Sequence, residues 1–254
     1  MPWNPEQYEQ FKQERFAPFY DLVALIDIKP DLKVIDLGCG TGELTATLAN
    51  DLPNSQVLGI DASEEMLSKT QRFVSENVCF RHQNIESMSD TYDLIFSHAA
   101  LQWIDNHAQL FTIIWSHLNP GGQILIQMPS NHNHVTHRLI QTLAATPPFA
   151  LAINHYQRVS PVLQIDDYAR LLYQLGAIEI QVFEKIYPHI LENADALLEW
   201  VKGTAMVPYL ERLSPDLQEQ WFESYRREIN STFSESPVFY PFRRILISAK
   251  KMAA

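Results

Sequence analysis

Short apolar runs alternate with amphipathic segments along most of the chain. Runs bounded by turn residues predict seven strands, at residues 33–37, 57–60, 78–83, 93–97, 123–128, 179–187 and 244–250. Apolar residues at helical spacing predict helices between these runs, at residues 43–50, 63–73, 108–118 and 166–175. Alternation of this kind is typical of an α/β fold in which helices cover both faces of one sheet.

Three regions fall outside this alternation. The first thirty residues predict a helical cap with an apolar face made by Tyr8, Phe11, Phe16, Phe19 and Leu22. Residues 129–165 are polar and proline-rich, and residues 190–232 are irregular, partly helical and rich in aromatic side chains. We expect both segments to be insertions that form a lid over the site, within a single domain of residues 1–254.

A glycine-rich turn follows the first predicted strand. The strand ends in Asp36, and glycine then occupies every second position at Gly38, Gly40 and Gly42 before a helix begins. Glycine tolerates backbone conformations that other residues avoid, and its missing Cβ lets a ligand lie against the backbone. The turn therefore predicts a bound ligand.

The spacing of this turn, D-x-G-x-G-x-G, differs from the G-x-G-x-x-G of dinucleotide sites. An acidic residue just before the turn suits a ligand with a cationic amino acid end, such as S-adenosylmethionine. The next strand ends in Asp61, at the position that accepts hydrogen bonds from ribose hydroxyls in the related dinucleotide fold. Ser63 then predicts a helix cap, and Met66 begins the apolar face of that helix.

The composition and net charge of the chain restrict the kinds of ligand and partner that it is expected to bind. The chain has 254 residues and a formal net charge of −11, which argues against a nucleic acid substrate and favours a small molecule. Cys39 and Cys79 are the only cysteines and lack zinc-type spacing, and no signal-peptide pattern or membrane-length apolar run occurs. We expect a cytoplasmic protein without membrane or nucleic acid partners; the sequence leaves the oligomeric state open, with a monomer plausible.

Ligands of open α/β sheets lie outside the carboxyl ends of the strands, which predicts further contacts. Asn84 can hydrogen-bond an adenine amine, and Ile85 can pack on the ring. The segment from Ser97 to Trp103 follows the fourth strand and should border the methionine part and the reacting methyl. The predicted cofactor contacts are Asp36, Gly38, Gly40, Gly42, Asp61, Ala62, Met66, Asn84, Ile85, Ser97 and Leu101.

The residues of the glycine turn and Asp61 together resemble the class I S-adenosylmethionine-dependent methyltransferases. Motifs spread over nearly the whole chain are similar to the trans-aconitate methyltransferase family: Trp3-Asn4-Pro5, Tyr8, Phe11, Arg15, Pro18, Leu101-Gln102-Trp103, Gln127-Met128-Pro129, Thr136-His137, Trp200-Val201, Pro208-Tyr209-Leu210, Phe242 and Arg244. The match is thin between Pro129 and Pro161, where the choice of acceptor could differ. The fold expected is a Rossmann-like, doubly wound sheet of seven strands with the last strand antiparallel.

This resemblance implies methyl transfer from S-adenosylmethionine to one carboxylate of a small tricarboxylic acid, leaving S-adenosylhomocysteine. A carboxylic acid with a pKa of about 4 is already ionised at neutral pH, so we expect no catalytic base and only positioning of the reactants. The residues expected around the acceptor are Tyr8, Arg15, Trp103, His137, Tyr187, His189, Trp200 and Arg244. The nearby His132 and His134 lack a coherent set of acidic partners, so no metal site is expected.

Two alternatives stay open at this point. A methyltransferase of the same fold could act on a carrier-bound acyl carboxylate or on a small hydroxyl or amine, although no lysine-rich run supplies a docking patch for an acidic carrier. A protein that binds the cofactor without catalysis is the other alternative. Retention of both Asp36 and Asp61 argues against it.

Overall fold

The computed structural model of the protein describes the backbone of residues 12–254 and the side chains of residues 16–254. Tyr8 and Phe11 lie outside the described residues. The strands are β1 Lys33–Leu37, β2 Gln56–Asp61, β3 Val78–His82, β4 Tyr92–His98, β5 Leu118–Pro129, β6 Ala177–Leu191 and β7 Val238–Lys251. The helices are α2 Lys12–Val23, α3 Glu43–Asn50, α4 Glu64–Leu67, α5 His107–Ser116, α6 Val135–Ala144, α7 Phe149–Ala152, α8 Ile165–Gln174, α9 Ala194–Lys202, α10 Val207–Leu210 and α11 Pro215–Thr232, with short 3-10 helices at Thr70–Phe73, Ile85–Ser87 and Leu101–Trp103.

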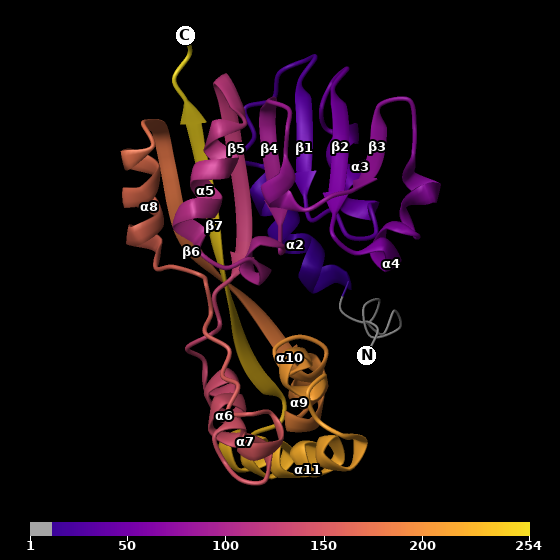
Figure 1. Ribbon diagram of the computed structural model, residues 1–254, viewed down its shortest axis with the longest axis vertical. Helices are drawn as coiled ribbons and strands as arrows, with labels where there is room; N and C mark the ends of the chain where they lie inside the picture. Colours follow the sequence, from indigo (N-terminus) through magenta and orange to yellow (C-terminus); the bar gives the residue numbers. More distant parts are fainter. Residues whose placement is uncertain (1–11) are drawn as a thin grey trace. The chain divides into compact units, whose positions relative to one another are not determined.

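The seven strands form one sheet in the order β3-β2-β1-β4-β5-β7-β6 (Figure 1). Strands β3, β2, β1, β4 and β5 pair in parallel, and β7 pairs antiparallel with β5. The strand order reverses next to β1, which places the glycine turn at the point where ligands bind in such sheets. The predicted fold class, with its antiparallel last strand, is confirmed.

The two faces of the sheet are covered by different helices because side chains alternate along each strand. Ile35 and Leu37 of β1 face a core built with α5 and α8, whereas Val34 faces a core built with α2 and α3. Phe19 and Leu22 of α2 are fully buried there, as their spacing predicts. Burial on both faces explains why the central strands β1 and β4 read as nearly continuous apolar runs.

The chain divides into two compact units. The sheet unit comprises Phe16–Pro129, Pro161–Lys185 and Arg244–Ala254, and the helical unit includes Ser130–Ser160 and Ile186–Arg243. The helical unit has its own core, built from α6, α7, α9, α10 and α11 around Trp221 and Tyr225. Most of the two predicted lid segments falls within it. A single domain for residues 1–254, and a lid role for these segments, stay predictions.

Three predicted elements differ from the structure. The N-terminal helix ends at Val23 and does not extend to residue 30, because the Gln123 amide binds the carbonyl of Leu25 and the N–H of Asp27, which a longer helix would bond internally. The helix predicted over residues 63–73 is split into α4 and a 3-10 turn, where the hydroxyls of Ser68 and Thr70 bond to backbone carbonyls three residues earlier.

The segment from 129 to 165 is more regular than its composition predicts. It contains α6, whose first turn carries His137 and whose buried face includes Ile140 and Ala144. The polar, proline-rich residues around it mask this short apolar stripe in the sequence. Helical structure in the second segment is confirmed by α9, α10 and α11.

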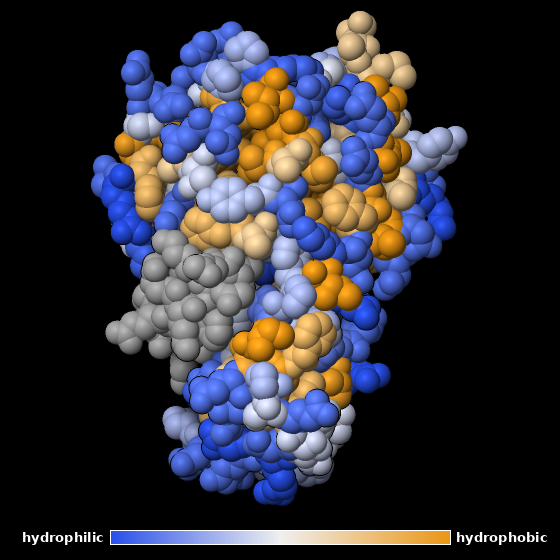
Figure 2. Space-filling view, turned by 180° about the vertical axis from the view of Figure 1, so that it is seen from behind, coloured by the Kyte–Doolittle hydropathy of each residue, from blue (hydrophilic) through white to orange (hydrophobic). Residues whose placement is uncertain are grey.

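The surface is largely polar, with apolar areas between the polar ones on the face shown in Figure 2. Large exposed apolar side chains include Leu151, Val159 and Tyr173. Within the described part of the chain, the search for a helix long and apolar enough to cross a membrane found none.

Candidate active site

The glycine turn joins β1 to α3 and is tied to the end of β2 by backbone hydrogen bonds. The N–H groups of Gly38 and Cys39 donate to the carbonyl of Ile60 at 2.8 and 2.9 Å. Gly38, Gly40 and Gly42 all have positive φ, at 76°, 56° and 82°, a region that costs other residues conformational energy. The sequence prediction of a strand, a tight turn and a helix is confirmed here.

Close packing adds a second reason for two of these glycines. A Cβ built on Gly38 would lie 2.2 Å from the Cβ of Ala100, and one on Gly42 would lie 2.7 Å from the Phe80 ring. At Gly40 the nearest atom is Cε of Met66, at 3.3 Å. The turn therefore needs glycine for the protein's own packing as well as for any ligand.

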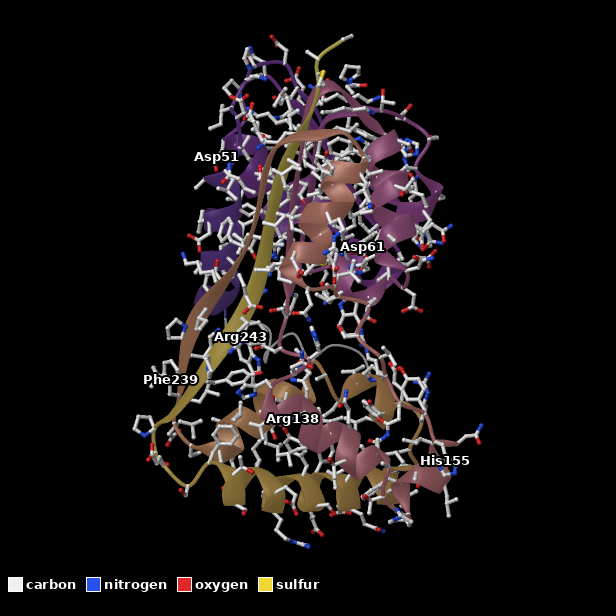
Figure 3. All side chains as sticks on the ribbon, turned by 90° about the vertical axis from the view of Figure 1, so that its left-hand side faces the viewer. Asp51, Asp61, Arg138, His155, Phe239 and Arg243 are labelled. Atoms are coloured by element: carbon white, nitrogen blue, oxygen red, sulfur yellow. The ribbon has the colours of Figure 1, made fainter. Side chains whose placement is uncertain are left out.

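Asp61 links the glycine turn to the loop after β2 (Figure 3). Its Oδ2 accepts a hydrogen bond from the N–H of Gly40 at 2.9 Å, and its Oδ1 accepts one from the N–H of Ser63 at 2.8 Å. An ionised carboxylate has about four acceptor positions, so two remain for hydroxyl donors. The predicted cap is also present, since Ser63 Oγ accepts from the N–H of Met66.

Asp36 is buried and turns toward α3. Its Oδ2 accepts a 2.6 Å hydrogen bond from the hydroxyl of Thr45, which is itself fully buried. Burial raises the pKa of Asp36 to about 7; the charge of Asp61 also raises it, and the Thr45 hydrogen bond partly offsets the rise. A cationic ligand nearby would favour the ionised carboxylate.

This raised pKa predicts a pH dependence of stability. The folded protein holds the proton of Asp36 up to about pH 7, whereas the unfolded chain releases it near the ordinary aspartate pKa of 3.8. The free energy of unfolding should therefore fall between about pH 4 and pH 7, by at most about 1.4 kcal/mol per pH unit from this group. Asp36→Asn should remove that contribution and be more stable than the wild type above pH 7.

Urea unfolding of both proteins at several pH values between 4 and 8 measures this effect. Asp27→Asn is the control, because Lys29 and Lys250 lower the pKa of Asp27, and its stabilising contribution is lost only as the pH falls below about 4. Parallel stability curves for Asp36→Asn and the wild type would contradict a buried, protonating Asp36.

The predicted adenine contacts lie just after β3. Asn84 is exposed, and its backbone carbonyl accepts hydrogen bonds from both the N–H and the hydroxyl of Ser87. Ile85 is buried in the core shared with α5. Ala62 is exposed at the end of β2, with its carbonyl 3.0 Å from Nε2 of His82. Their cofactor contacts stay predictions.

The residues after β4 differ in their surroundings. Ser97 is fully buried, and its hydroxyl donates to the carbonyl of Leu37 at 2.8 Å, which ties β4 to β1. Leu101 is fully buried too, and its carbonyl accepts from Nε2 of His107 at 3.0 Å. Trp103 is 46% exposed. Ser97 and Leu101 thus have structural roles, and direct contact with a cofactor stays a prediction for both.

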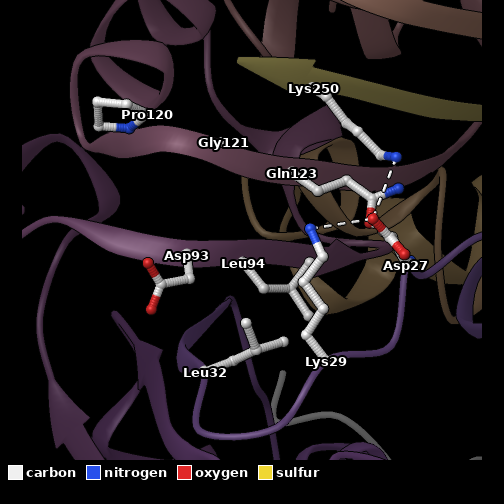
Figure 4. A pocket seen from close by; sticks show the side chains of 9 residues that line it. All are labelled: Asp27, Lys29, Leu32, Asp93, Leu94, Pro120, Gly121, Gln123 and Lys250. Atoms are coloured by element: carbon white, nitrogen blue, oxygen red, sulfur yellow. Dashed lines mark hydrogen bonds and ion pairs between the residues drawn. The ribbon is translucent and has the colours of Figure 1, made fainter. Parts of the chain in front are cut away.

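A separate hollow in the sheet unit lies at the opposite edge of the sheet (Figure 4). It is lined by residues near the start of β1, β4 and β5, including Leu32, Asp93 and Gln123. Asp27 forms ion pairs with Lys29 and Lys250 there, at 3.1 and 3.2 Å. The positive charges of the two lysines offset the negative charge of Asp27 at the surface.

The predicted acceptor residues fall into both units. Trp103 and Arg244 belong to the sheet unit. Tyr8 and the side chain of Arg15 lie outside the described residues, although the backbone of Arg15 belongs to α2. The helical unit holds the rest, which are His137, Tyr187, His189 and Trp200.

Within the helical unit the structure brings His189 and Trp200 together. Their rings meet edge to face at 4.5 Å between centroids, and His189 stacks on Phe242 at 5.2 Å. Tyr187 is buried nearby on the same strand. These contacts form an aromatic cluster with an imidazole at its centre.

His137 belongs to a second, basic group at the start of α6. Burial, together with smaller effects of the neighbouring His134, His132 and Arg158, lowers its pKa to about 4, so its ring is neutral at pH 7. Arg138 on α6 and Arg243 on β7, both labelled in Figure 3, lower the pKa of His134, for which burial is the larger cause. The group brings positive charge together in a chain that is acidic overall.

Sequence reasoning missed two polar residues at the sheet, the partly buried His98 and the fully buried Gln127. His98 ends β4 and Gln127 lies on β5, directly opposite it. Both occur in segments named above, but neither was singled out as a site residue. A polar side chain inside a buried apolar strand is the signal that could have identified Gln127.

The fold and the glycine turn define the class of protein. A family model described as "Methyltransferase domain" matches residues 28–178, more than half of the chain. Among solved structures, the YcgJ protein from Bacillus subtilis has a TM-score of 0.61 at 16% identity, covering 94% of this chain and 100% of that one. A phosphoethanolamine N-methyltransferase from Haemonchus contortus has a TM-score of 0.55 at 17% identity, covering 93% and 52%. The protein is a Rossmann-like methyltransferase.

Full-length relatives narrow this class. A protein from Deinococcus radiodurans named trans-aconitate 2-methyltransferase is 43% identical, with 99% of each chain covered. One of the same name from Variovorax paradoxus is 35% identical, with 100% of each chain covered. The chain belongs to the trans-aconitate 2-methyltransferase family.

Proposed function

We propose that the protein transfers the methyl group of S-adenosylmethionine to a carboxylate of a small polycarboxylic acid such as trans-aconitate. The observation that carries this proposal is the 43% identity, over nearly the whole of both chains, to a relative named for that reaction. The geometry of the glycine turn supports the donor half. The product would be a methyl ester, with S-adenosylhomocysteine released.

The residues of the glycine turn fit the proposed cofactor. Asp61 keeps two acceptor positions for ribose hydroxyls after bonding to Gly40 and Ser63. Asp36 offers a carboxylate, and Asn84 is exposed after β3 where an adenine amine would need a partner. When bound, S-adenosylmethionine supplies an electrophilic methyl group on a sulfonium.

The protein's task in this reaction is to hold the acceptor. An ionised carboxylate is a competent nucleophile, so no side chain has to remove a proton. Alignment of two bound reactants can lower the barrier by several kcal/mol. Arg244 is suited to bind a second carboxylate of the acceptor, because its guanidinium is permanently charged and its side chain is only 4% exposed. We propose acceptor contacts for Trp103, His137, Tyr187, His189 and Trp200 as well.

The test uses labelled S-adenosylmethionine with trans-aconitate, cis-aconitate, isocitrate and an acyl carrier substrate. We expect label in a methyl ester of trans-aconitate that mild base hydrolyses. The trimethyl ester of trans-aconitate, which has no free carboxylate, is the control and should receive none. A base-stable product would indicate a hydroxyl or amine acceptor, and binding without turnover of any acid would indicate a non-catalytic protein. A cytoplasmic location belongs to the proposal.

A further inference from the structure

Polar side chains lie next to one another on β4, β5 and β7 of the sheet unit, partly buried at His98 and buried at Gln127 and Arg244. His98 ends β4 and pairs in register with Gln127, and Arg244 on β7 lies opposite Pro129, two residues further along β5. Gln127 is fully buried and Arg244 is 4% exposed. Alternate residues share a face of a sheet, so all three side chains lie on the face packed by α2.

Two glutamines on this face of β5 show what is unusual about Gln127. Gln123 is also buried, and its amide is fully bonded: Oε1 accepts from the N–H of Asp27, and Nε2 donates to the carbonyl of Leu25 and the hydroxyl of Ser248, each at 2.9 Å. Nε2 of Gln127 is buried with no hydrogen-bond partner among the residues that the structure describes. Gln123 is a structural residue, whereas Gln127 has an unused donor.

The orientation of the Gln127 amide is determined by Arg244. A guanidinium can only donate hydrogen bonds, so the amide oxygen must face it, at 3.4 Å from Nη1. The NH₂ group therefore points away from Arg244. Buried donors of this kind are nearly always satisfied, which indicates a missing acceptor.

His98 provides a second unsatisfied group beside the first. Its Nε2 is buried without a partner among the described residues. Burial and the charge of Arg244 lower the pKa of His98 to about 3, so the ring is neutral at pH 7. Phe19 of α2 lies edge-on against this ring, at 5.9 Å between centroids. A neutral imidazole protonated on Nε2 donates one hydrogen bond.

A cation with two neutral donors is the chemistry that binds a carboxylate. Such a carboxylate could belong to the acceptor or to the methionine end of the cofactor. The proposed cofactor residues follow β1 and β2, whereas Gln127 and Arg244 lie on β5 and β7, two and three strands beyond β1 in the sheet order. Adjacent strands are about 4.8 Å apart, so the distance favours the acceptor.

We propose that Gln127 and His98, together with Arg244, bind a carboxylate of the acceptor and so determine which acids are methylated. This inference rests on the proposed function and adds two specificity-determining residues to it. Gln127 and His98 donate to the carboxylate oxygens, and Arg244 supplies the charge.

Gln127→Leu tests the proposal. We expect the KM for trans-aconitate to rise at least tenfold, the Kd for S-adenosylhomocysteine to change less than twofold, and the midpoint of thermal unfolding to stay the same or rise. Gln123→Leu is the matched control, because it removes a fully bonded glutamine from the same face of the same strand. It should lower the unfolding midpoint and leave the KM unchanged.

Gln127→Glu is the second variant, in case the leucine variant does not fold. Its carboxylate should pair with Arg244 and repel the acceptor, raising the KM further than leucine does. An unchanged KM in both variants would overturn the proposal. A weaker Kd for S-adenosylhomocysteine with an unchanged KM would overturn it too, because the bound carboxylate would then be the cofactor's.

Calorimetric titration of trans-aconitate into the protein with S-adenosylhomocysteine separates this inference from the proposed function. Binding by the wild type that is lost in Gln127→Leu, without any turnover, would support the binding residues and reject the reaction. Turnover with equal KM in wild type and variant would reject the binding residues alone. Neither binding nor turnover of any acid tested would reject both.

Discussion

Replacing Gly38 with alanine should destabilise the protein by about 2–5 kcal/mol and abolish cofactor binding at ordinary concentrations. The backbone φ of +76° costs a non-glycine residue about 1–2 kcal/mol. The new Cβ would also lie 2.2 Å from the Cβ of Ala100, and relieving such a collision costs about 1–3 kcal/mol more. Urea unfolding and calorimetric titration of S-adenosylhomocysteine measure the two effects.

Gly176→Ala is the matched control for this prediction. Gly176 has nearly the same φ, at +78°, but a Cβ there would meet nothing within 4 Å. Its substitution should cost only the backbone energy and leave cofactor binding intact. The double variant Gly38→Ala with Ala100→Gly should recover the part of the loss that comes from the collision. Equal losses at Gly38 and Gly176 would show that the contact with Ala100 is unimportant.

Replacing Asp61 with asparagine should weaken binding of S-adenosylhomocysteine by about 10- to 100-fold. Hydrogen bonds to a charged group contribute about 1.5–3 kcal/mol each, and the amide keeps only one acceptor oxygen. Alanine is a less informative change, because it would also free the N–H groups of Gly40 and Ser63 that the carboxylate now binds. Asparagine keeps the shape and one of these bonds.

Two controls test whether Asp61 acts through the ribose hydroxyls of the cofactor. Ser63→Ala removes the cap of α4 in the same loop without changing the carboxylate, and should cost about 1 kcal/mol of stability with unchanged affinity. An analogue of S-adenosylhomocysteine without ribose hydroxyls should bind wild type and Asp61→Asn equally. If the variant loses affinity for this analogue as well, Asp61 does not act through the ribose.

Much of the fold could be predicted from local patterns. The positions of the central strands follow from apolar runs, since a strand buried on both faces needs apolar residues throughout, and the edge strand β6 follows from alternation. Errors arose after Val23, where the distant Gln123 amide binds backbone groups of Leu25 and Asp27, and at the Ser68 and Thr70 hydroxyls that interrupt the helix after Ser63. The short helix α6 was missed because its short apolar stripe lies within a polar, proline-rich segment.

The candidate site was predictable only in part. The spacing of residues alone identified the glycine turn and Asp61. A backbone with positive φ favours glycine, and a carboxylate at the end of a strand is recognisable from the apolar run before it. The spacing could not show that the Asp61 carboxylate also accepts hydrogen bonds from the N–H groups of Gly40 and Ser63. It could not show that Asp36 turns to Thr45 in α3, where burial raises its pKa.

The sequence by itself determined the class of fold, the place of the glycine turn and the family, because these depend on periodicity and on residues close together in the chain. Only the tertiary structure decided which polar groups become partners. Gln127 and Arg244 are 117 residues apart and meet because β7 pairs with β5 inside the sheet. Whether a buried donor has a hydrogen-bond partner depends on the residues that surround it in space. No local sequence pattern specifies those residues.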